Sequence, residues 1–276
     1  MPTSKDNSAS TSLHEQILEI PEETLKNIDS FNNRYLGYIL KSLYATHPEM
    51  QEVIDSELNK AISNKKHDKV QRLIEEADFP LYPNHFKLDD FDSSCLSDED
   101  KKQLEELKTL AFINSDCPNI TLKGPQHFGS EKLASGLGDM LCNKLYSVRY
   151  IKFSQLLAIL STHRTNASSN SEYEKLQKKD CLIIEDFAGE AVEDRDLLSA
   201  IYTFLETRVT AHRNSFSYSR SRNNGRFKPS ATIITTCRDY REWGSFFDCD
   251  VNKASSLIAL FYGYGCLLNV DEAKQE

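Results

Sequence analysis

The amino-acid sequence predicts an α/β fold in which helices cover both faces of a parallel β-sheet. The first observation behind this prediction is an alternation that begins at Asn119, where short runs rich in β-branched residues alternate with stretches of helical periodicity. The second is the run Cys181–Ile184, which is apolar throughout, as expected of a strand that is buried on both faces. Because parallel neighbours are usually joined by crossover helices, the alternation indicates three layers with the sheet in the middle.

The residues before the sheet are predicted to form a small helical region. Residues 1–12 are rich in Ser, Thr and Asn, which predicts a disordered tail, and residues 13–113 are mostly helical in character. Within them, Glu52 to Ile74 has apolar residues at helical spacing, and a second predicted helix, Asp98 to Phe112, begins with acidic residues. The prolines in Phe79–Pro83 predict a linker, which we place at residues 79–97.

Five strands are expected in the remaining domain, residues 114–276. They are Asn119–Lys123, Ser147–Phe153, Cys181–Ile184, Ala231–Thr236 and Gly265–Val270. The stretches between them are long enough to provide the crossover connections of a doubly wound sheet. Since the chain ends soon after the fifth run, we expect no helical lid at the C-terminus.

The composition predicts a cytoplasmic protein. The chain has 276 residues, of which 39% are hydrophobic and 27% are charged, and its net charge is −9 at pH 7. No apolar run approaches the ~20 residues that span a bilayer, and no signal peptide is evident. We therefore expect no membrane partner.

The first predicted strand leads into a loop whose two glycines have the spacing of a phosphate-binding loop, GxxxxGK[ST]. In that motif, backbone N–H groups wrap the phosphates, the Lys contacts the terminal phosphates and the hydroxyl binds magnesium. Here Ser130 occupies the Lys position and Glu131 the hydroxyl position, so a carboxylate faces the place of the triphosphate. The candidate binding residues are Gly124, Pro125, Gln126, His127, Phe128, Gly129, Ser130 and Glu131.

Two acids follow the apolar run Cys181–Ile184. Glu185 and Asp186 would stand at the carboxyl end of a buried strand, which matches a Walker B element. In such an element, one acid holds magnesium and the next polarises the attacking water. Glu185 and Asp186 are therefore the candidate catalytic and metal-binding residues.

A basic segment lies inside this acidic chain. We predict a loop insertion at residues 213–229 that carries Arg213, Arg220, Arg222, Arg226 and Lys228, with Phe216, Tyr218 and Phe227 among them. Such a loop can bind DNA by pairing its cations with phosphates and stacking its rings on bases. The alternative is a solvated insertion between a helix and a strand, and the sequence leaves both interpretations open.

Together, these segments resemble the IstB/DnaC-like branch of the AAA+ ATPases, which are transposition helpers and helicase loaders. The resemblance extends from about Glu52 to the C-terminus, and Tyr146–Leu157 carries it in addition to the glycine loop. Arg241–Phe247 is similar to the family's SEWGxxF segment. The resemblance also implies that Arg238, at the end of Ile233–Arg238, is the sensor of the terminal phosphate.

From this family likeness we expect an AAA+ P-loop NTPase fold, with ATP and magnesium as cofactors. It further implies DNA as a partner, together with a transposase, a replicative helicase or an active paralogue, and it is compatible with a homo-oligomer. Ser130 and Glu131 oppose the binding of ATP and magnesium.

Departures from the family pattern cluster where hydrolysis would occur. The Lys and the hydroxyl of the loop are replaced, and Ala259 and Leu260 stand where the family carries an Asp-Arg pair whose Arg reaches the neighbouring subunit's nucleotide. Phosphoryl transfer requires these charges to compensate those of the transferred group. The sequence therefore predicts a pseudo-ATPase, a hydrolysis-deficient accessory factor of DNA transposition or replication.

Two alternatives remain open at this point. In the first, the protein is an active ATP-dependent DNA-remodelling or helicase-loading ATPase, with Lys132, Lys123 or Arg238 replacing the lost cations. In the second, it is a protein-interaction module that works without nucleotide.

Overall fold

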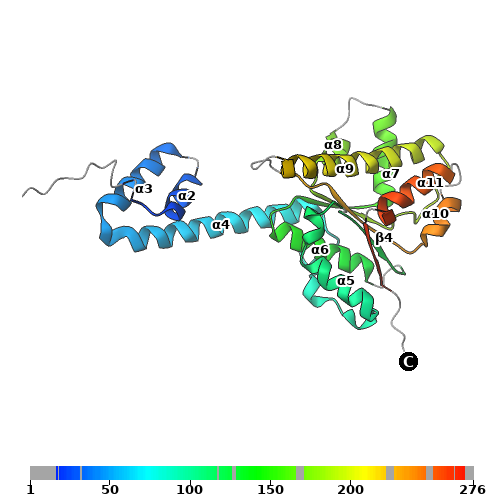
Figure 1. Cartoon of the computed structure of the whole chain (residues 1–276), viewed down its shortest axis with the longest axis horizontal. Helices are drawn as coiled ribbons and strands as arrows, with labels where there is room; N and C mark the ends of the chain where they lie inside the picture. The colour runs from blue at the N-terminus through cyan, green and yellow to red at the C-terminus, as the bar shows by residue number, and fades with distance from the viewer. Residues whose placement is uncertain are drawn as a thin grey trace, which may run out of the picture. The chain divides into compact units, whose positions relative to one another are not determined.

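The computed structural model describes residues 17, 19–31, 33–116, 118–125, 129–165, 171–221, 227–246, 251–263 and 265–270. The chain forms two compact units that meet in sequence between Lys69 and Val70. Both units are drawn in Figure 1. Within the described ranges, every helix is too short or too polar to cross a lipid bilayer.

The first unit is helical. It contains α2 (Glu22–Asp29), α3 (Arg34–Thr46), the short η1 (Pro48–Met50) and the first part of α4 (Gln51–Ala77). Its core is built from Ile20, Ile28, Tyr44, Ile54 and Leu58. The Tyr44 hydroxyl donates to Asp55 at 2.9 Å, and the Asn33 side chain caps α3 by accepting from the Leu36 amide.

The second unit contains the five-stranded parallel sheet that the sequence predicts. Its strand order is β2-β3-β4-β1-β5, with β1 (Asn119–Lys123), β2 (Val148–Lys152), β3 (Cys181–Glu185), β4 (Ala231–Thr236) and β5 (Gly265–Asn269). Each predicted strand agrees with the structure to within one residue at either end. In the centre, Ile233 of β4 is level with Ile120 of β1 and with Ile183 of β3.

Helices cover both faces of the sheet, as Figure 1 shows for the second unit. One face carries α5 (Asp98–Lys108), η4 (Ala111–Asn114) and α6 (Ser130–Asn143). The other carries α7 (Phe153–Thr165), α8 (Ser171–Lys178), α9 (Arg195–Ser221), α10 (Tyr240–Phe246), α11 (Val251–Ile258) and the π-helical η6 (Ala259–Gly263). Because side chains alternate along a strand, Ile183 lies in the core of the first face, whereas Leu182 and Ile184 lie in that of the second.

The segment between α4 and α5 is not a linker, which differs from the prediction for residues 79–97. It contains η2 (Leu88–Asp90) and η3 (Ser93–Cys95) and packs on α6. Gly136 allows this approach, since a Cβ there would lie 2.8 Å from the backbone nitrogen of Leu88. Residues 70–113, placed by the sequence in the N-terminal region, therefore share the core of the sheet.

The basic segment also differs from its prediction, because most of its described part is helical. Residues 213–221 continue α9, and the predicted loop at 213–229 is shortened accordingly. Two contacts at helical spacing support the helix: the Phe216 ring lies 6.4 Å from His212, and the Arg220 guanidinium lies 4.7 Å from the centre of the Phe216 ring. The Phe227 ring of the following segment packs on Phe216 at 5.9 Å. Arg222 and Arg226 lie outside the described residues. Residues 271–276 do so as well, so the expectation that a helical lid is absent stays a prediction.

Candidate functional site

The candidate site lies where strands β1, β2 and β3 end and α6 begins. In open parallel sheets, ligands bind outside the carboxyl ends of the strands. Gly124 follows β1 directly, and Gly129 precedes the first residue of α6. Gly129 has φ 123°, a left-handed conformation that disfavours a side chain, and a Cβ at Gly124 would overlap the carbonyl oxygen of Val270. Gln126, His127 and Phe128, three of the predicted binding residues, lie outside the described part of the chain.

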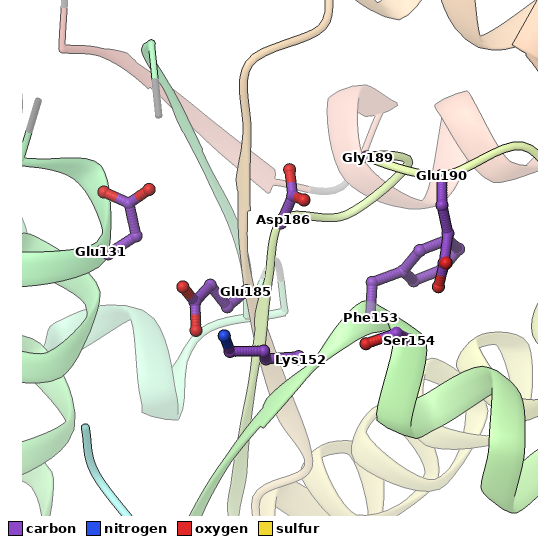
Figure 2. Close-up of a pocket in the computed structure, with 8 residues that line it drawn as sticks. All are labelled: Glu131, Lys152, Phe153, Ser154, Glu185, Asp186, Gly189 and Glu190. Atoms are coloured by element: carbon purple, nitrogen blue, oxygen red, sulfur yellow. The ribbon is translucent and has the colours of Figure 1, made fainter. Parts of the chain in front are cut away.

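A cavity of about 220 Å³ opens at this edge of the sheet. We call it the acidic cavity, and its lining residues are Glu131, Lys152, Phe153, Ser154, Glu185, Asp186, Gly189 and Glu190. In Figure 2, Glu131 in the first turn of α6 lies across from Glu185 and Asp186 at the end of β3. Four carboxylates face one ammonium group among these residues, so the walls of the acidic cavity are negatively charged.

Glu185 ends β3 and lies beside Lys152, its partner in the register of β2 and β3. Burial raises the pKa of the Glu185 carboxyl above its ordinary value, and the carboxylates of Glu131 and Asp186 add to this effect. The Lys152 ammonium opposes it. Glu185 thus lies at the end of a buried strand, and its Walker B role stays a prediction.

Asp186 begins the turn after β3 in an uncommon conformation, with φ 54°. Its backbone N–H donates to the Thr235 hydroxyl at 3.0 Å, and its carbonyl accepts from the Gly189 amide at 2.9 Å. Its buried Oδ1 has no hydrogen-bond partner among the described residues. Such an oxygen fits a magnesium ion, although the described His, Cys, Asp and Glu side chains form no metal-binding group of three or more by themselves.

Comparison with known proteins identifies the family. The model of the IstB-like ATP binding protein family matches residues 43–213, which is more than half of the chain. The chain belongs to this family. The match and the parallel sheet confirm the P-loop α/β fold expected from the sequence.

Two relatives show how far the similarity extends. The ATP-binding protein assigned to insertion sequence IS1162 of Pseudomonas fluorescens is 30% identical over 119 residues, which cover 40% of this chain and 52% of that protein. An insertion sequence IS21-like ATP-binding protein of Bacteroides fragilis (strain YCH46) is 24% identical over 165 residues, which cover 59% of this chain and 82% of that protein. The IstB-like chain thus spans about half the length of the first relative and most of the second.

A solved structure shares the fold. A protein assigned as a primosome component of Streptococcus pyogenes serotype M3 superposes with a TM-score of 0.50 and 13% identity, covering 74% of this chain and 97% of that one. At this identity, the similarity concerns the fold alone.

Three cations of the IstB-like chain were candidates to replace the lost charges of the loop, and none of them lines the acidic cavity. Lys123 forms an ion pair with Asp239 at 3.1 Å, and the Lys132 ammonium lies 5.8 Å from the centre of the Phe86 ring. The Arg238 Nε donates to the carbonyl of Ala188 at 2.8 Å, which places Arg238 on the turn that follows Asp186.

Sequence reasoning missed two cations that matter for this region. Among the described residues, Lys152 is the cation that lines the acidic cavity. Its only signal in the sequence was its place near the end of a predicted strand, because its alignment with Glu185 comes from the register of β2 and β3. Arg208 of α9 is fully buried, and burial lowers its pKa to about 10. Its N–H groups donate to carbonyl oxygens near the end of α8 and at the start of β4. No local sequence pattern predicts this role.

The sequence predicts that Ala259 and Leu260 take the place of the family's Arg finger, and both lie beyond the matched residues 43–213. Leu260 is 7% exposed and packs in the core of the second face, while its carbonyl accepts from the Asn119 side chain at 2.8 Å. The Leu260 side chain therefore lies inside the protein.

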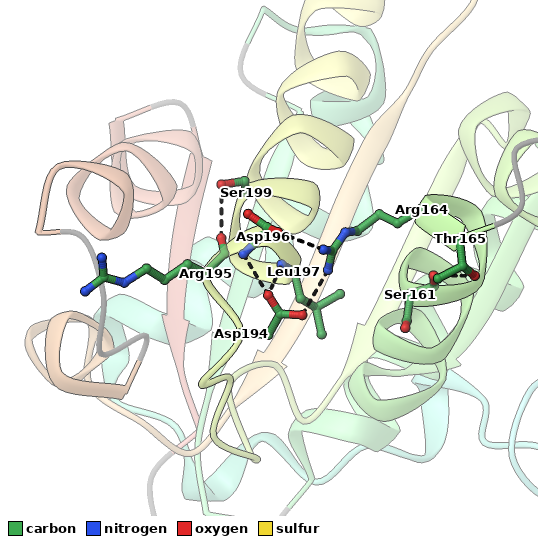
Figure 3. A network of polar contacts seen from close by, with 8 residues as sticks. All are labelled: Ser161, Arg164, Thr165, Asp194, Arg195, Asp196, Leu197 and Ser199. Atoms are coloured by element: carbon green, nitrogen blue, oxygen red, sulfur yellow. Dashed lines mark hydrogen bonds and ion pairs between the residues drawn. The ribbon is translucent and has the colours of Figure 1, made fainter.

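An ion-pair network holds the start of α9 (Figure 3). Arg164, in the last turn of α7, donates to Asp194 and to Asp196 at 3.0 Å each. The Asp194 Oδ1 also accepts from the amides of Asp196 and Leu197, so that Asp194 caps the helix. The Arg164 hydrogen bond and these two amides hold the pKa of Asp194 below its usual range.

We expect Asp194→Ala to lower the melting temperature at pH 7 and to have little effect near pH 3. The pKa of Asp194 is lower in the folded than in the unfolded state, so its contribution is present above the unfolded pKa and is lost as the pH falls through the folded pKa. Thermal unfolding from pH 3 to 7 measures this, with the neighbouring exposed Glu193→Ala as control. A difference between wild type and Asp194→Ala that stays constant with pH would contradict the ionic role.

Proposed function

We propose that this IstB-like protein is an accessory factor of DNA transposition or replication that does not turn over ATP. The observation that carries the proposal is the placement of Glu131 in the acidic cavity, opposite Glu185 and Asp186. A working loop would offer a Lys and a hydroxyl at this place, whereas here Glu131 repels the phosphates. The positions of Lys123, Lys132 and Leu260 support the proposal, because none of these residues brings a compensating cation to the cavity.

The relatives are described as ATP-binding proteins, so we infer that residual nucleotide affinity comes from the loop backbone and the N-terminus of α6. Glu185 and Asp186 would hold magnesium, which when bound supplies positive charge that neutralises the phosphates. Buried Asp186 Oδ1 is the atom that fits this role best. The position of Arg238 beside the same turn supports a sensor role for it.

Removing the charge of Glu131 alone should strengthen nucleotide binding. We expect Glu131→Gln to bind ATP with magnesium about tenfold more tightly than the natural chain, since one nearby like charge contributes on the order of 1 kcal/mol of repulsion in a partly solvated site. Isothermal titration calorimetry measures both affinities. The exposed Glu174→Gln, on α8 and outside the cavity, is the control, and an unchanged affinity in Glu131→Gln would count against the proposed repulsion.

The end of α9 is the proposed DNA contact. Arg213 and Arg220 lie on this helix, Tyr218 is 49% exposed, and the Lys228 amide donates to the Ser215 hydroxyl, which ties the following segment to the helix. These positions bring cations and an aromatic ring together, as phosphate and base contacts require.

Replacing Arg220, Arg222 and Arg226 with Ala should flatten the salt dependence of DNA binding. Each lost phosphate contact lowers the slope of log K against log salt by about 0.7–0.9, so we expect a decrease of roughly 2–3. Fluorescence anisotropy at several salt concentrations, with single- and double-stranded oligonucleotides, measures the slope. A slope equal to that of the natural chain would remove this segment from the DNA interface.

We further propose that the protein acts in the cytoplasm with a transposase, a replicative helicase or an active paralogue, and that it self-associates. The insertion-sequence context of the relatives supports the transposition partner. Sedimentation velocity with and without ATP tests self-association, and a monomer under both conditions would limit the proposal to hetero-complexes.

A further inference from the structure

A second cavity, of about 260 Å³, shares Glu131 and Glu185 with the acidic cavity. We call it the hydroxyl cavity. Its other lining residues are Pro80, Leu81, Phe86, Lys132, Ser135 and Tyr150. They come from the segment that packs on α6, from α6 itself and from β2, all within the second unit.

The hydroxyl cavity contains two buried hydroxyl groups, those of Ser135 and Tyr150, which are each 3% exposed. The Ser135 hydroxyl has no hydrogen-bond partner within the described part of the chain. The Tyr150 phenol interacts with Glu185, and burial together with this carboxylate raises its pKa, so the phenol stays protonated and its oxygen can still accept a hydrogen bond. Because buried polar groups in proteins are normally hydrogen-bonded, the Ser135 hydroxyl and the open acceptor position of Tyr150 indicate a site that a ligand completes.

The charge and the apolar surface of the hydroxyl cavity define the ligand. Glu131 and Glu185 contribute two carboxylates, whereas Lys132, above the Phe86 ring, contributes one cation. Phe86 and the 82% exposed Leu81 provide apolar walls against which an aliphatic chain can pack. The cavity therefore suits a short apolar stem that ends in a cationic group with several N–H donors.

We propose that the hydroxyl cavity binds an alkyl ammonium or alkyl guanidinium group. The stem packs on Phe86 and Leu81, the N–H groups donate to the hydroxyls of Ser135 and Tyr150, and the charge faces the shared carboxylates. The group can come from a free amine or from a Lys or Arg side chain of a partner protein. An occupied site lowers the negative potential of the neighbouring acidic cavity, but binding itself requires no nucleotide and does not rest on the function proposed above.

The test is a calorimetric titration of the full chain, free of nucleotide and at constant ionic strength, with n-butylguanidinium. The proposal predicts saturable binding of one equivalent, weakened at least tenfold in Ser135→Ala/Tyr150→Phe and in Glu131→Gln. The uncharged 1-pentanol should bind at least tenfold more weakly than n-butylguanidinium. Circular dichroism and melting temperature show whether each variant is folded, and Glu174→Gln on the surface of α8 controls for a general loss of negative charge.

A second titration separates the sources of the cation. The peptide acetyl-Gly-Arg-Gly-amide should bind if the cavity receives a side chain from a partner, whereas binding of n-butylguanidinium alone assigns the site to small free cations. No saturable binding of either probe would overturn the proposal. Binding that changes less than threefold in both the hydroxyl variant and Glu131→Gln would also overturn it, because it would show unspecific attraction to an acidic surface.

Discussion

Replacing Arg208 with Met is expected to lower the free energy of unfolding by about 3 kcal/mol. Arg208 is fully buried, and its N–H groups donate to neutral oxygens of three segments. These partners are the carbonyls of Leu176, Gln177, Lys179 and Ala231 and the hydroxyl of Thr232. Met fills a similar volume but leaves these buried acceptors without donors. The free energy lost with these hydrogen bonds is larger than the desolvation cost that is saved when the buried charge is removed.

Thermal unfolding measures this effect, and about 3 kcal/mol corresponds to a decrease in melting temperature of roughly 6–12 °C. Arg195→Met is the matched control, because Arg195 lies in the same helix but is exposed. A decrease for Arg208→Met no larger than that of the control would show that the buried guanidinium contributes little to joining α8, α9 and β4.

Restoring the two lost groups of the loop, by Ser130→Lys with Glu131→Thr, is expected to strengthen ATP binding about 100-fold. The change replaces a repulsive carboxylate with a hydroxyl and adds an attractive ammonium group at the start of α6. If each of these changes contributes about 1.4 kcal/mol, the two together amount to a factor of about 100. The conformation of Gly129 supports the expectation, since φ 123° favours glycine and glycines let the backbone N–H groups of such a loop approach phosphates.

Titration calorimetry with ATP and magnesium compares the double variant with each single variant and with the natural chain. Each single variant is expected to gain about tenfold, and no gain in Glu131→Thr alone would count against the proposed repulsion by Glu131. No gain in the double variant would mean that residues 124–131 do not cradle phosphates. Turnover should stay absent even in the double variant, because the buried Leu260 leaves the finger position without a cation.

The sheet was predictable because buried parallel strands leave a strong local signal. Cys181–Ile184 and Ala231–Thr236 are short, apolar and β-branched, and both appear as strands in the structure. The positions of the glycine loop and of Glu185 and Asp186 could be predicted from the same strands, because the carboxyl ends of parallel strands meet at one edge of the sheet.

The features that could not be predicted from the sequence depend on contacts between distant segments. The packing of Leu88 on Gly136 joins residues far apart in the chain, and the prolines nearby suggested a linker instead. Phe216 and Phe227 stabilise the end of α9 through ring contacts that span the helix and the following segment, so a loop was predicted where a helix forms. Lys152 becomes part of the site only through the register of β2 with β3.

The central claim is that this IstB-like protein has retained the scaffold and lost turnover. It is tested most directly by single-turnover hydrolysis of radiolabelled ATP with protein in excess, at saturating magnesium and in the presence of DNA. The control is Glu185→Gln/Asp186→Asn, which removes both candidate catalytic acids. We predict that the natural chain hydrolyses ATP no faster than this control. A rate well above that of the control would contradict the account.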